Sequence, residues 1–395
     1  MENMYLTRKA IRKLPGAIMK MVPMPEPEII EGFGCRSQIG RICSEAGFDT
    51  VLILTDKHLC DLGYLEAVKK SLEGKSIRYK VFDRITTEPR LEYIEAGRSI
   101  ALDIEAKCII TIGGGSVMDT GKMVASGCRL RHLPVDMLLQ KFLVVPEKSL
   151  PIIAVPSTAG TGAEVTVGAV ITNSRGGKFA SVIVGLNVHT VLLDSELTVR
   201  APWTITASCG IDALSHGLEG AIADVRSSQD DMGKSRQCVR LVLENLPKLK
   251  EHPEDIAARG AMCLAANLGG NAINKQLAGY VHAFAHSIGA KYHIPHGKAI
   301  AMCLMPVLRS QMDSCAQQLS DLAHFCNFDN VDALFNSLES VIALCELNLD
   351  GSIIAPGDFK ELSIAIAKDS INYSAPVTFP RSQIVNILSE INKHK

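Results

Sequence analysis

The sequence lacks several features that would point to particular partners. Aromatic side chains make up only 5% of the 395 residues, and the formal net charge is −1. Because charges of both signs are dispersed along the chain, a binding surface for nucleic acid is not expected. No uninterrupted apolar run approaches the length that crosses a membrane. Neither nucleic acid nor a membrane is therefore predicted as a partner, and the composition is that of an ordinary soluble globular protein.

Cysteine patterns that would indicate disulfides or a thiolate metal site are also missing. The 12 cysteines are scattered, and no Cys-x-x-Cys pair occurs. In a chain of this length, reduced and partly buried thiols are the expected state. The first residues include Arg8, Lys9, Arg12 and Lys13, but they lack the apolar core and cleavage site of a secretory signal. These observations predict a cytoplasmic protein.

Short apolar runs alternate with helix-like stretches in the first half of the chain. Runs of strand length occupy residues 50–55, 108–112 and 152–155, and a shorter run lies at 191–193. Apolar strands separated by helices predict a parallel sheet that is covered on both faces. Ligands of such sheets bind at the carboxyl ends of the strands.

The second half of the chain has a different pattern. Beyond about residue 203 the strand signals largely disappear and helical periodicity replaces them. At 395 residues the chain is long enough for two separate cores. We therefore predict an α/β nucleotide-binding domain with a parallel sheet over residues 1–200, followed by an all-helical metal-binding domain over residues 201–395.

A cluster of histidines lies in the helical half. Residues 282–296 contain four of the 11 histidines of the chain, and neutral imidazole is the commonest protein ligand for a transition metal. His282 and His286 share one face of a predicted helix. Pro295 should end that helix or open a loop, so that His296 folds back toward the same point. A solvated, histidine-rich helix end is the alternative interpretation of this segment.

A second pair of possible ligands strengthens the metal interpretation. Asp212 and His216 are four residues apart in a stretch of good helix formers. Alone, this pair is more typical of an ordinary helix surface. Together with the histidine cluster it predicts a site of one carboxylate and three imidazoles, from Asp212, His216, His282 and His296, which suits Fe(II), Zn(II) or Mn(II). His286 and His293 are then left for chemistry or packing.

Two segments of the first half are candidates for binding a nucleotide. Three glycines at 113–115 follow a predicted strand and precede a helix-like stretch, an arrangement that lets a pyrophosphate approach the backbone at a helix N-terminus. Hydroxyls alternate with glycines at 156–164, after another strand. A tight turn explains the three glycines about as well as a nucleotide site does. For the segment 156–164, a helix cap is the alternative explanation. Asp56 follows the first strand and would accept from ribose hydroxyls, which favours NAD over NADP.

These segments together resemble the iron-containing alcohol dehydrogenase family. The motifs occur in the family's order and spacing, from about residue 28 to 310. They are Gly32-Phe-Gly, Thr55-Asp56, Gly-Gly-Gly-Ser-x-x-Asp at 113–119, Pro-x-Thr-Ala-Gly-Thr-Gly-x-Glu-Val-Thr at 156–166, Asp-Ala-Leu-Ser-His at 212–216 and His-Ala-Phe-Ala-His…Pro-His-Gly at 282–297.

The resemblance implies the fold and the cofactors of an NAD(P)-dependent dehydrogenase. It implies one divalent metal, Fe(II) first and Zn(II) as the alternative, on the four ligands named above. It implies a homodimer or larger assembly, and places His286 near the nicotinamide and the substrate. The implied cofactor contacts are Asp56, Gly114, Gly115, Ser116, Asp119, Ser157, Thr158, Thr161, Thr166 and Lys178.

The expected activity is reversible hydride transfer between NAD, with NADP as a possibility, and a small alcohol or aldehyde. The metal would polarise the substrate oxygen, and His286 would relay the proton. The alternatives are a lyase resembling dehydroquinate synthase, a polyol oxidoreductase resembling glycerol dehydrogenase, and a binding protein without redox activity. The chain departs from the family pattern at Val117, at Glu88-Pro89 and at Ser374-Ala-Pro. The last of these lies where the family shapes its substrate pocket, so the sequence does not identify the substrate.

Overall fold

The computed structural model describes residues 22–86, 88–173, 177–223, 228–347 and 354–392. The chain forms two compact units. The α/β unit comprises residues 23–158 and 162–201, and the helical unit takes in residues 159–161 and the chain from Pro202 onward. The short segment 159–161 therefore belongs to the helical unit although the α/β unit flanks it in sequence. A parallel sheet followed by helices confirms the predicted fold class.

The α/β unit is built on a six-stranded sheet in which every neighbouring pair is parallel. The strands, in spatial order, are β1 (Glu28–Glu31), β9 (Val188–Leu193), β6 (Ile152–Pro156), β4 (Cys108–Gly113), β2 (Thr50–Thr55) and β3 (Arg78–Phe82). The three apolar runs predicted as strands are β2, β4 and β6, which lie side by side. Their carboxyl ends therefore meet at one edge of the sheet.

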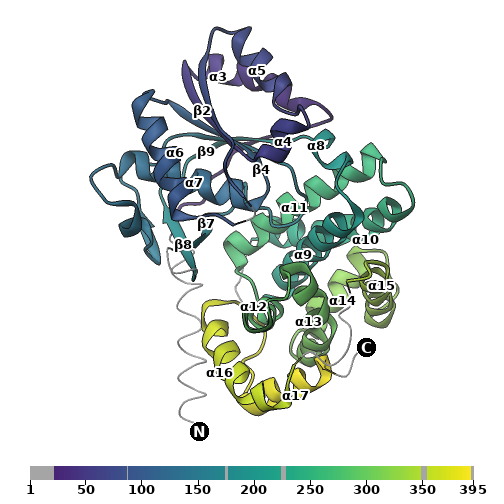
Figure 1. The fold of residues 1–395 in the computed structure, drawn as a ribbon. Helices are drawn as coiled ribbons and strands as arrows, with labels where there is room; N and C mark the ends of the chain where they lie inside the picture. Colours follow the sequence, from purple (N-terminus) through teal and green to yellow (C-terminus); the bar gives the residue numbers. More distant parts are fainter. Residues whose placement is uncertain (1–21, 87, 174–176, 224–227, 348–353, 393–395) are drawn as a thin grey trace. The chain divides into compact units, whose positions relative to one another are not determined.

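Helices cover both faces of this sheet, as Figure 1 shows. The side chains of Val51 and Ile53 belong to a core formed with α3 (Ile39–Glu45) and α5 (Glu66–Glu73). Leu54 points to the other face, where it lies next to glycines of α6 (Leu91–Asp103) and α7 (Gly115–Arg129). Successive strand residues point to opposite faces. A strand covered on both sides is therefore continuously apolar, as the sequence of β2 shows.

A smaller sheet completes the α/β unit. Its strands are β5 (Phe142–Val144), β8 (Lys178–Val184) and β7 (Gly168–Thr172), of which β8 pairs parallel with β5 and antiparallel with β7. The remaining helical segments of the unit are η1 (Cys35–Gln38), α4 (Lys57–Asp61), η2 (Val135–Leu138) and α8 (Glu196–Val199).

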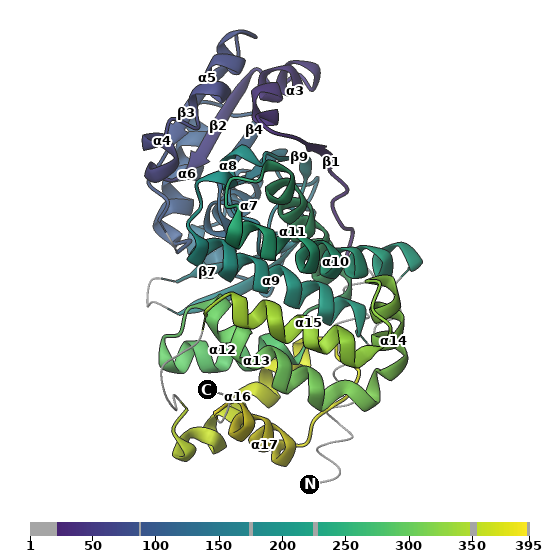
Figure 2. The same ribbon diagram turned by 90° about the vertical axis from the view of Figure 1, so that its right-hand side faces the viewer.

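The helical unit consists of helices and short turns of helix (Figure 2). Its α9 (Trp203–Ala221) packs against α10 (Gln229–Glu251), α11 (Ile256–Gln276) and α13 (His296–Gln311). None of the helices in the described part of the chain is long and apolar enough to cross a membrane. The other segments are α12 (Tyr280–Tyr292), η3 (Met312–Ser314), α14 (Ala316–Phe325), α15 (Val331–Leu344), η4 (Pro356–Asp358), α16 (Phe359–Asp369), η5 (Ser370–Asn372) and α17 (Arg381–Ile391).

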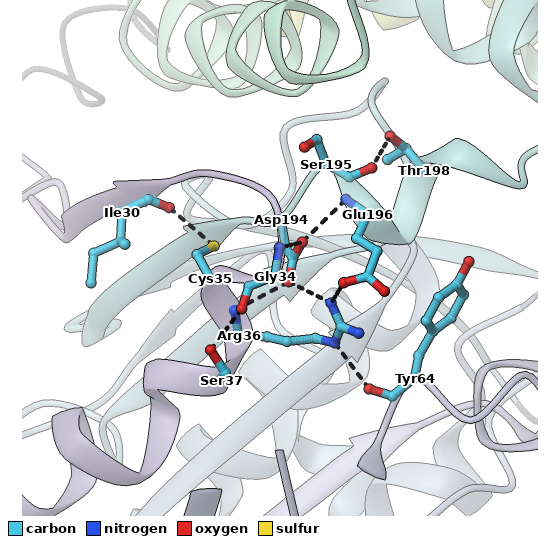
Figure 3. A network of polar contacts seen from close by, with 10 residues as sticks. All are labelled: Ile30, Gly34, Cys35, Arg36, Ser37, Tyr64, Asp194, Ser195, Glu196 and Thr198. Carbon is cyan, nitrogen blue, oxygen red and sulfur yellow. Dashed lines mark hydrogen bonds and ion pairs between the residues drawn. The ribbon is translucent and has the colours of Figure 1, made fainter. Parts of the chain in front are cut away.

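A buried ion-pair network ties the start of the α/β unit to the end of β9 (Figure 3). The Arg36 guanidinium lies 2.8 Å from an Asp194 carboxylate oxygen and 2.7 Å from one of Glu196. Its Nε also donates to the Tyr64 carbonyl at 3.0 Å. The Asp194 carboxylate is fully buried and accepts from the backbone N–H groups of Gly34 and Arg36. This single carboxylate thereby fixes the loop that follows β1.

Candidate functional site

Three helices bring the predicted metal ligands together. Asp212 and His216 lie one turn apart on α9, His282 lies on α12, and His296 is the first residue of α13. One ligand atom each from Asp212, His282 and His296 lies within 4.8 Å of the others. The Asp212 Oδ1 atom is 3.1 Å from His296 Nε2, 3.7 Å from His282 Nε2 and 3.6 Å from His216 Nε2. The structure thus gathers all four side chains around one carboxylate oxygen.

Local sequence explains how His296 reaches α9. His293 ends α12 in the left-handed conformation, with φ of 53°, and Pro295 immediately precedes α13 in an extended conformation. The residue after His296 is Gly297, where an added Cβ would lie 2.0 Å from Ser208 Oγ on α9. Only glycine allows this close an approach of the two helices. The residues on either side of His296, Pro295 and Gly297, therefore determine where this histidine lies.

The cluster is buried apart from one ligand. Asp212, His216 and His282 are 3–4% exposed, whereas the His296 side chain is 42% exposed. Burial by itself would raise the pKa of Asp212, but the neighbouring His216 and His296 outweigh it and hold that pKa well below the ordinary value. Burial likewise opposes charging of His282, yet the adjacent Glu219 raises its pKa. The Asp212 carboxylate is therefore ionised, and the surrounding imidazoles stabilise its charge.

Two unpaired nitrogens test whether a metal ion suits these residues. Among the described residues, His282 Nε2 and His216 Nδ1 are buried ring nitrogens with no hydrogen-bond partner. Leaving a buried polar atom unpaired costs about 1–3 kcal/mol, so such atoms usually have a ligand or another partner. His282 Nε2 faces Asp212, the carboxylate shared by the whole cluster. Three imidazoles and one carboxylate fit Fe(II) or Zn(II).

Glu219 belongs to this cluster but was not among the predicted site residues. It is 3% exposed, and its Oε2 lies 2.6 Å from His282 Nδ1, the ring nitrogen that faces away from Asp212. Its other oxygen accepts from the backbone N–H of Val281 at 2.7 Å. The sequence does contain a signal: Glu219 stands three residues after His216 and seven after Asp212, which places all three on one face of a helix.

The two remaining histidines of the cluster segment have different surroundings. The His286 ring centroid lies 5.3 Å from that of His296, and its Nδ1 is 3.0 Å from the Tyr373 hydroxyl. Its side chain is 46% exposed, so the ring is accessible to solvent beside the proposed ligands. His293 is exposed in the connection between α12 and α13. The proton-relay role of His286 stays a prediction, for which this position is suitable.

The two candidate nucleotide segments meet at one edge of the sheet. Gly113 is the last residue of β4, and Gly114 immediately precedes α7, whose N-terminus has no side-chain cap. The Ser157 N–H, just beyond β6, donates to the Gly113 carbonyl at 2.9 Å. An added Cβ at Gly114 would lie 3.6 Å from Thr158. Gly114, Gly115, Ser116, Ser157 and Thr158 are therefore neighbours beside an uncapped helix N-terminus.

The glycines of this turn have different reasons to be glycine. A Cβ at Gly113 would lie 2.4 Å from Val117 Cγ2, so the fold itself excludes a side chain there. At Gly114 the backbone is ordinary, with φ of −79°, and an added Cβ would make only normal contacts with Thr158. A tight turn explains Gly113 but not Gly114. The second glycine is better explained by a ligand that approaches the backbone.

Because of this difference, we expect one alanine substitution to lower stability and the other to weaken cofactor binding. Gly113→Ala should lower the free energy of unfolding by about 1–3 kcal/mol, because it overpacks the turn. Gly114→Ala should leave stability within about 0.5 kcal/mol. It should nevertheless weaken NADH binding about tenfold, which corresponds to the loss of one hydrogen bond to a charged group. Urea unfolding and fluorescence titration with NADH measure the two effects, and unchanged affinity in Gly114→Ala would return Gly114 to a structural role.

The predicted contacts Asp119 and Thr166 take part in a network around a buried lysine. Lys122 is 2% exposed, and its Nζ lies 3.0 Å from Asp119 Oδ1 and 3.0 Å from Thr166 Oγ1. It also donates to the Gly168 carbonyl, while Asp119 Oδ2 accepts from the Val170 N–H. Asp119 thus joins α7 to β7, and Thr166, just before β7, contacts α7 through Lys122. The sequence did not indicate these roles. The contact of both side chains with a cofactor stays a prediction.

Three other predicted cofactor contacts belong to other segments of the chain. Asp56 follows β2 and caps α4, accepting from the Leu59 N–H at 2.9 Å through one of its two oxygens. Lys178 is exposed at the start of β8. Thr161 belongs to the helical unit. The structure therefore groups five of the ten predicted contacts closely, and Asp56 keeps a second oxygen for a ligand.

Comparison with known protein families gives a consistent result over both units. The family model described as iron-containing alcohol dehydrogenase matches residues 26–195. The model described as the C-terminal part of the Fe-containing alcohol dehydrogenase family matches residues 206–392. Together these two matches cover most of the chain, including every predicted metal ligand.

Individual relatives match over nearly their whole length. The NAD-dependent methanol dehydrogenase of Bacillus methanolicus is 27% identical over 93% of this chain and 98% of its own. A probable alcohol dehydrogenase of Salmonella typhimurium, EutG, is 30% identical over 88% and 85% of the two chains. Among solved structures, sulfoacetaldehyde reductase from Bifidobacterium kashiwanohense, in complex with NAD+, superposes with a TM-score of 0.87 at 26% identity, covering 95% of this chain and 99% of the other.

Proposed function

This chain belongs to the iron-containing alcohol dehydrogenase family, and from that premise we propose a specific assignment of its activity to its residues. The reaction is reversible hydride transfer between NAD(H) and a small alcohol or aldehyde, in which a divalent metal assists. The observation that carries this proposal is the buried cluster around Asp212, where His282 Nε2 faces the carboxylate and has no hydrogen-bond partner among the described residues. That nitrogen, the neighbouring imidazoles and that carboxylate have the chemistry of a metal site.

In this proposal Asp212, His216, His282 and His296 hold the metal. The metal would supply a Lewis acid at the substrate oxygen, and NAD(H) would carry the hydride. Side chains can do neither. His286 exchanges the alcohol proton with solvent, which its half-exposed ring beside His296 supports. Tyr373 holds the His286 ring through Nδ1, so that Nε2 is the ring atom available to accept or deliver the proton.

For the cofactor, we assign the pyrophosphate to the N-terminus of α7. The neighbouring turn and loop, with Gly114, Gly115, Ser116, Ser157 and Thr158, support this assignment because they surround an uncapped helix end. Asp56 is assigned to the adenosine ribose. The remaining proposed contacts are Asp119, Thr161, Thr166 and Lys178.

The charge of Asp56 is expected to set the preference for NAD over NADP. Asp56→Asn keeps an oxygen that can cap α4 but removes the charge that repels a 2′-phosphate. The ratio of kcat/KM for NADP to that for NAD should rise about tenfold or more. Steady-state kinetics with both cofactors measure this ratio. If it does not change, Asp56 acts only as a helix cap.

The names of the relatives indicate only a broad class of substrate. Their names refer to methanol, to 1,3-propanediol and to sulfoacetaldehyde, all small molecules with an alcohol or aldehyde group. We propose a small alcohol or aldehyde for this chain as well. Its physiological identity requires a panel of short alcohols, diols, hydroxy acids and aldehydes, assayed on metal-loaded protein.

A label-transfer experiment tests the proposed reaction directly. Protein loaded with Fe(II) under anaerobic conditions is incubated with NAD and with alcohols deuterated at the carbinol carbon. The proposal expects deuterium in the NADH that is released and loss of turnover after chelation, with recovery when Fe(II) returns. Metal-free protein that transfers deuterium at an undiminished rate would contradict it. Turnover without release of labelled NADH would favour a lyase reaction.

We further propose that the protein is cytoplasmic and forms a homodimer or a larger assembly. None of the 12 cysteines, each within the described part of the chain, is in a disulfide bond, which supports a reducing compartment. The proposed domain boundary near residue 200 is supported by the end of the α/β unit at Ala201. Light scattering of the purified protein tests the assembly state.

A further inference from the structure

We propose that Glu219 is a positioning residue that orients His282 and fixes its tautomer for metal binding. The inference rests on the metal site of the proposed function and assigns a role to a side chain that contacts a proposed ligand without binding the metal itself. Its basis is the arrangement of His282 and backbone donors around one buried carboxylate.

Glu219 holds the His282 ring on the side opposite to the proposed metal. Glu219 Oε2 lies 2.6 Å from Nδ1, and the other ring nitrogen, Nε2, lies 3.7 Å from Asp212 Oδ1. Both residues are 3% exposed, so water does not compete for these contacts. Because the ring is held at Nδ1, its Nε2 can point only toward the carboxylate that the other ligands share.

The same contact determines which nitrogen carries the proton. An ionised carboxylate accepts hydrogen bonds and cannot donate them, so a His282 ring that binds a metal as the neutral imidazole must have its hydrogen on Nδ1. The lone pair is then on Nε2, where a metal would bind. Such partners of a ligating histidine orient the ring and raise its basicity, and their loss typically weakens metal binding about 10–100-fold.

A glutamine cannot replace this carboxylate. Glu219 Oε1 accepts from the Val281 N–H at 2.7 Å while Oε2 accepts from His282, so two donors need two acceptor atoms. Glutamine offers one oxygen and an NH₂ group that donates. Glu219→Gln must either leave the Val281 N–H unpaired or turn a donor toward Nδ1, which forces the ring hydrogen onto Nε2. In the second case His282 cannot ligate through Nε2.

A purely structural role is the competing interpretation, because Glu219 also caps α12. The backbone N–H of Val281, near the start of α12, is one of its donors, and negative charge at a helix N-terminus is stabilising. A cap alone would affect stability and leave the metal affinity of the folded protein unchanged. Metal affinity therefore distinguishes the two roles.

Gly279 offers a second way to disturb Glu219 without changing its charge. It immediately precedes α12, and an added Cβ would lie 2.7 Å from Glu219 Oε1 and 3.2 Å from the Ser374 carbonyl. The backbone φ of −129° is one that alanine adopts readily. Gly279→Ala should therefore displace the carboxylate from His282 while every proposed ligand stays intact.

The test compares the wild type with Glu219→Gln, Gly279→Ala and a control, Asp255→Ala. The control removes a cap from α11, where Asp255 accepts from the Ala258 N–H at 3.0 Å, and it leaves the metal cluster untouched. Metal dissociation constants are measured by competition between each apo protein and a chelator for Zn(II). Absorption spectra of the Co(II)-loaded proteins report the number and type of ligands.

The proposal expects Kd for Zn(II) to rise about 10–100-fold in both site variants and not in the control, with altered Co(II) ligand-field bands. Variants that melt at lower temperature but bind Zn(II) as tightly as the wild type would overturn it. A wild type that binds no metal would instead overturn the proposed function.

A measurement on the wild type covers the case in which the variants do not fold. Spectra that correlate ring protons with isotopically labelled histidine nitrogens show which nitrogen carries the hydrogen. In the Zn(II)-loaded wild type, one ring should have a strongly deshielded proton on Nδ1, as a short hydrogen bond to a carboxylate produces, and its Nε2 on the metal. Absence of such a ring would overturn the proposal.

Discussion

His282→Ala is expected to abolish tight metal binding and to lower kcat/KM about 10³-fold or more, because a metal contributes several kcal/mol to stabilising charge on the substrate oxygen. His282 is the most constrained of the proposed ligands, with Glu219 on one ring nitrogen and Asp212 facing the other. Its removal leaves both buried carboxylates without the ring between them. Elemental analysis and steady-state kinetics on the same preparation measure the two effects.

The matched control for this variant is His293→Asn. His293 lies in the same segment but is exposed, and its φ of 53° is a conformation that asparagine tolerates. The control should keep its metal content and its activity. A His282→Ala protein that remains metal-replete and fully active would eliminate His282 as a ligand, and with it the cluster as the catalytic centre.

Arg36→Met is expected to lower the free energy of unfolding of the α/β unit by about 3–5 kcal/mol, the usual result of removing one partner of a buried ion pair. The substitution leaves the fully buried Asp194 carboxylate without its guanidinium. It also removes the hydrogen bond to the Tyr64 carbonyl. Urea unfolding, followed by circular dichroism, provides the measurement.

Arg41→Met is the control for this second prediction. Arg41 pairs with Glu45 at 2.7 Å, but both side chains are about half exposed or more, at 48% and 62%. Exposed pairs contribute little to stability, so the control should unfold close to the wild type. If the two variants shift the urea midpoint equally, the network of Figure 3 does not stabilise the unit beyond a surface pair.

The grouping of the proposed metal ligands could be predicted in part because local geometry determines how some of them are arranged. Asp212 and His216 share a face of α9 through helical spacing alone, and Pro295 separates His296 from the helix of His282. The convergence of three helices on one point could not be read from any single segment. It depends on close contacts such as that of Gly297 with Ser208, which become visible only when the helices are packed.

Strands were predictable where burial is complete and missed where it is partial. The central strands β2 and β4 are buried at every position and have continuous apolar sequences. The edge strand β3 alternates exposed and half-buried residues and includes Arg78 and Lys80, so its sequence resembles a surface segment. The contact of Asp119 with Val170 could not be predicted either. The two residues are distant in sequence, and no local pattern connects them.

The segment 159–161 has a consequence for how this protein can be divided. It belongs to the helical unit, and Gly160 packs so closely on α9 that a Cβ would lie 2.9 Å from the Cα of Cys209. A polypeptide cut at Pro202 would therefore lack part of the surface that α9 needs to be covered. A fragment that begins at Pro202 would expose this patch of α9, so we expect it to be less stable alone than when residues 159–161 are added as a separate peptide.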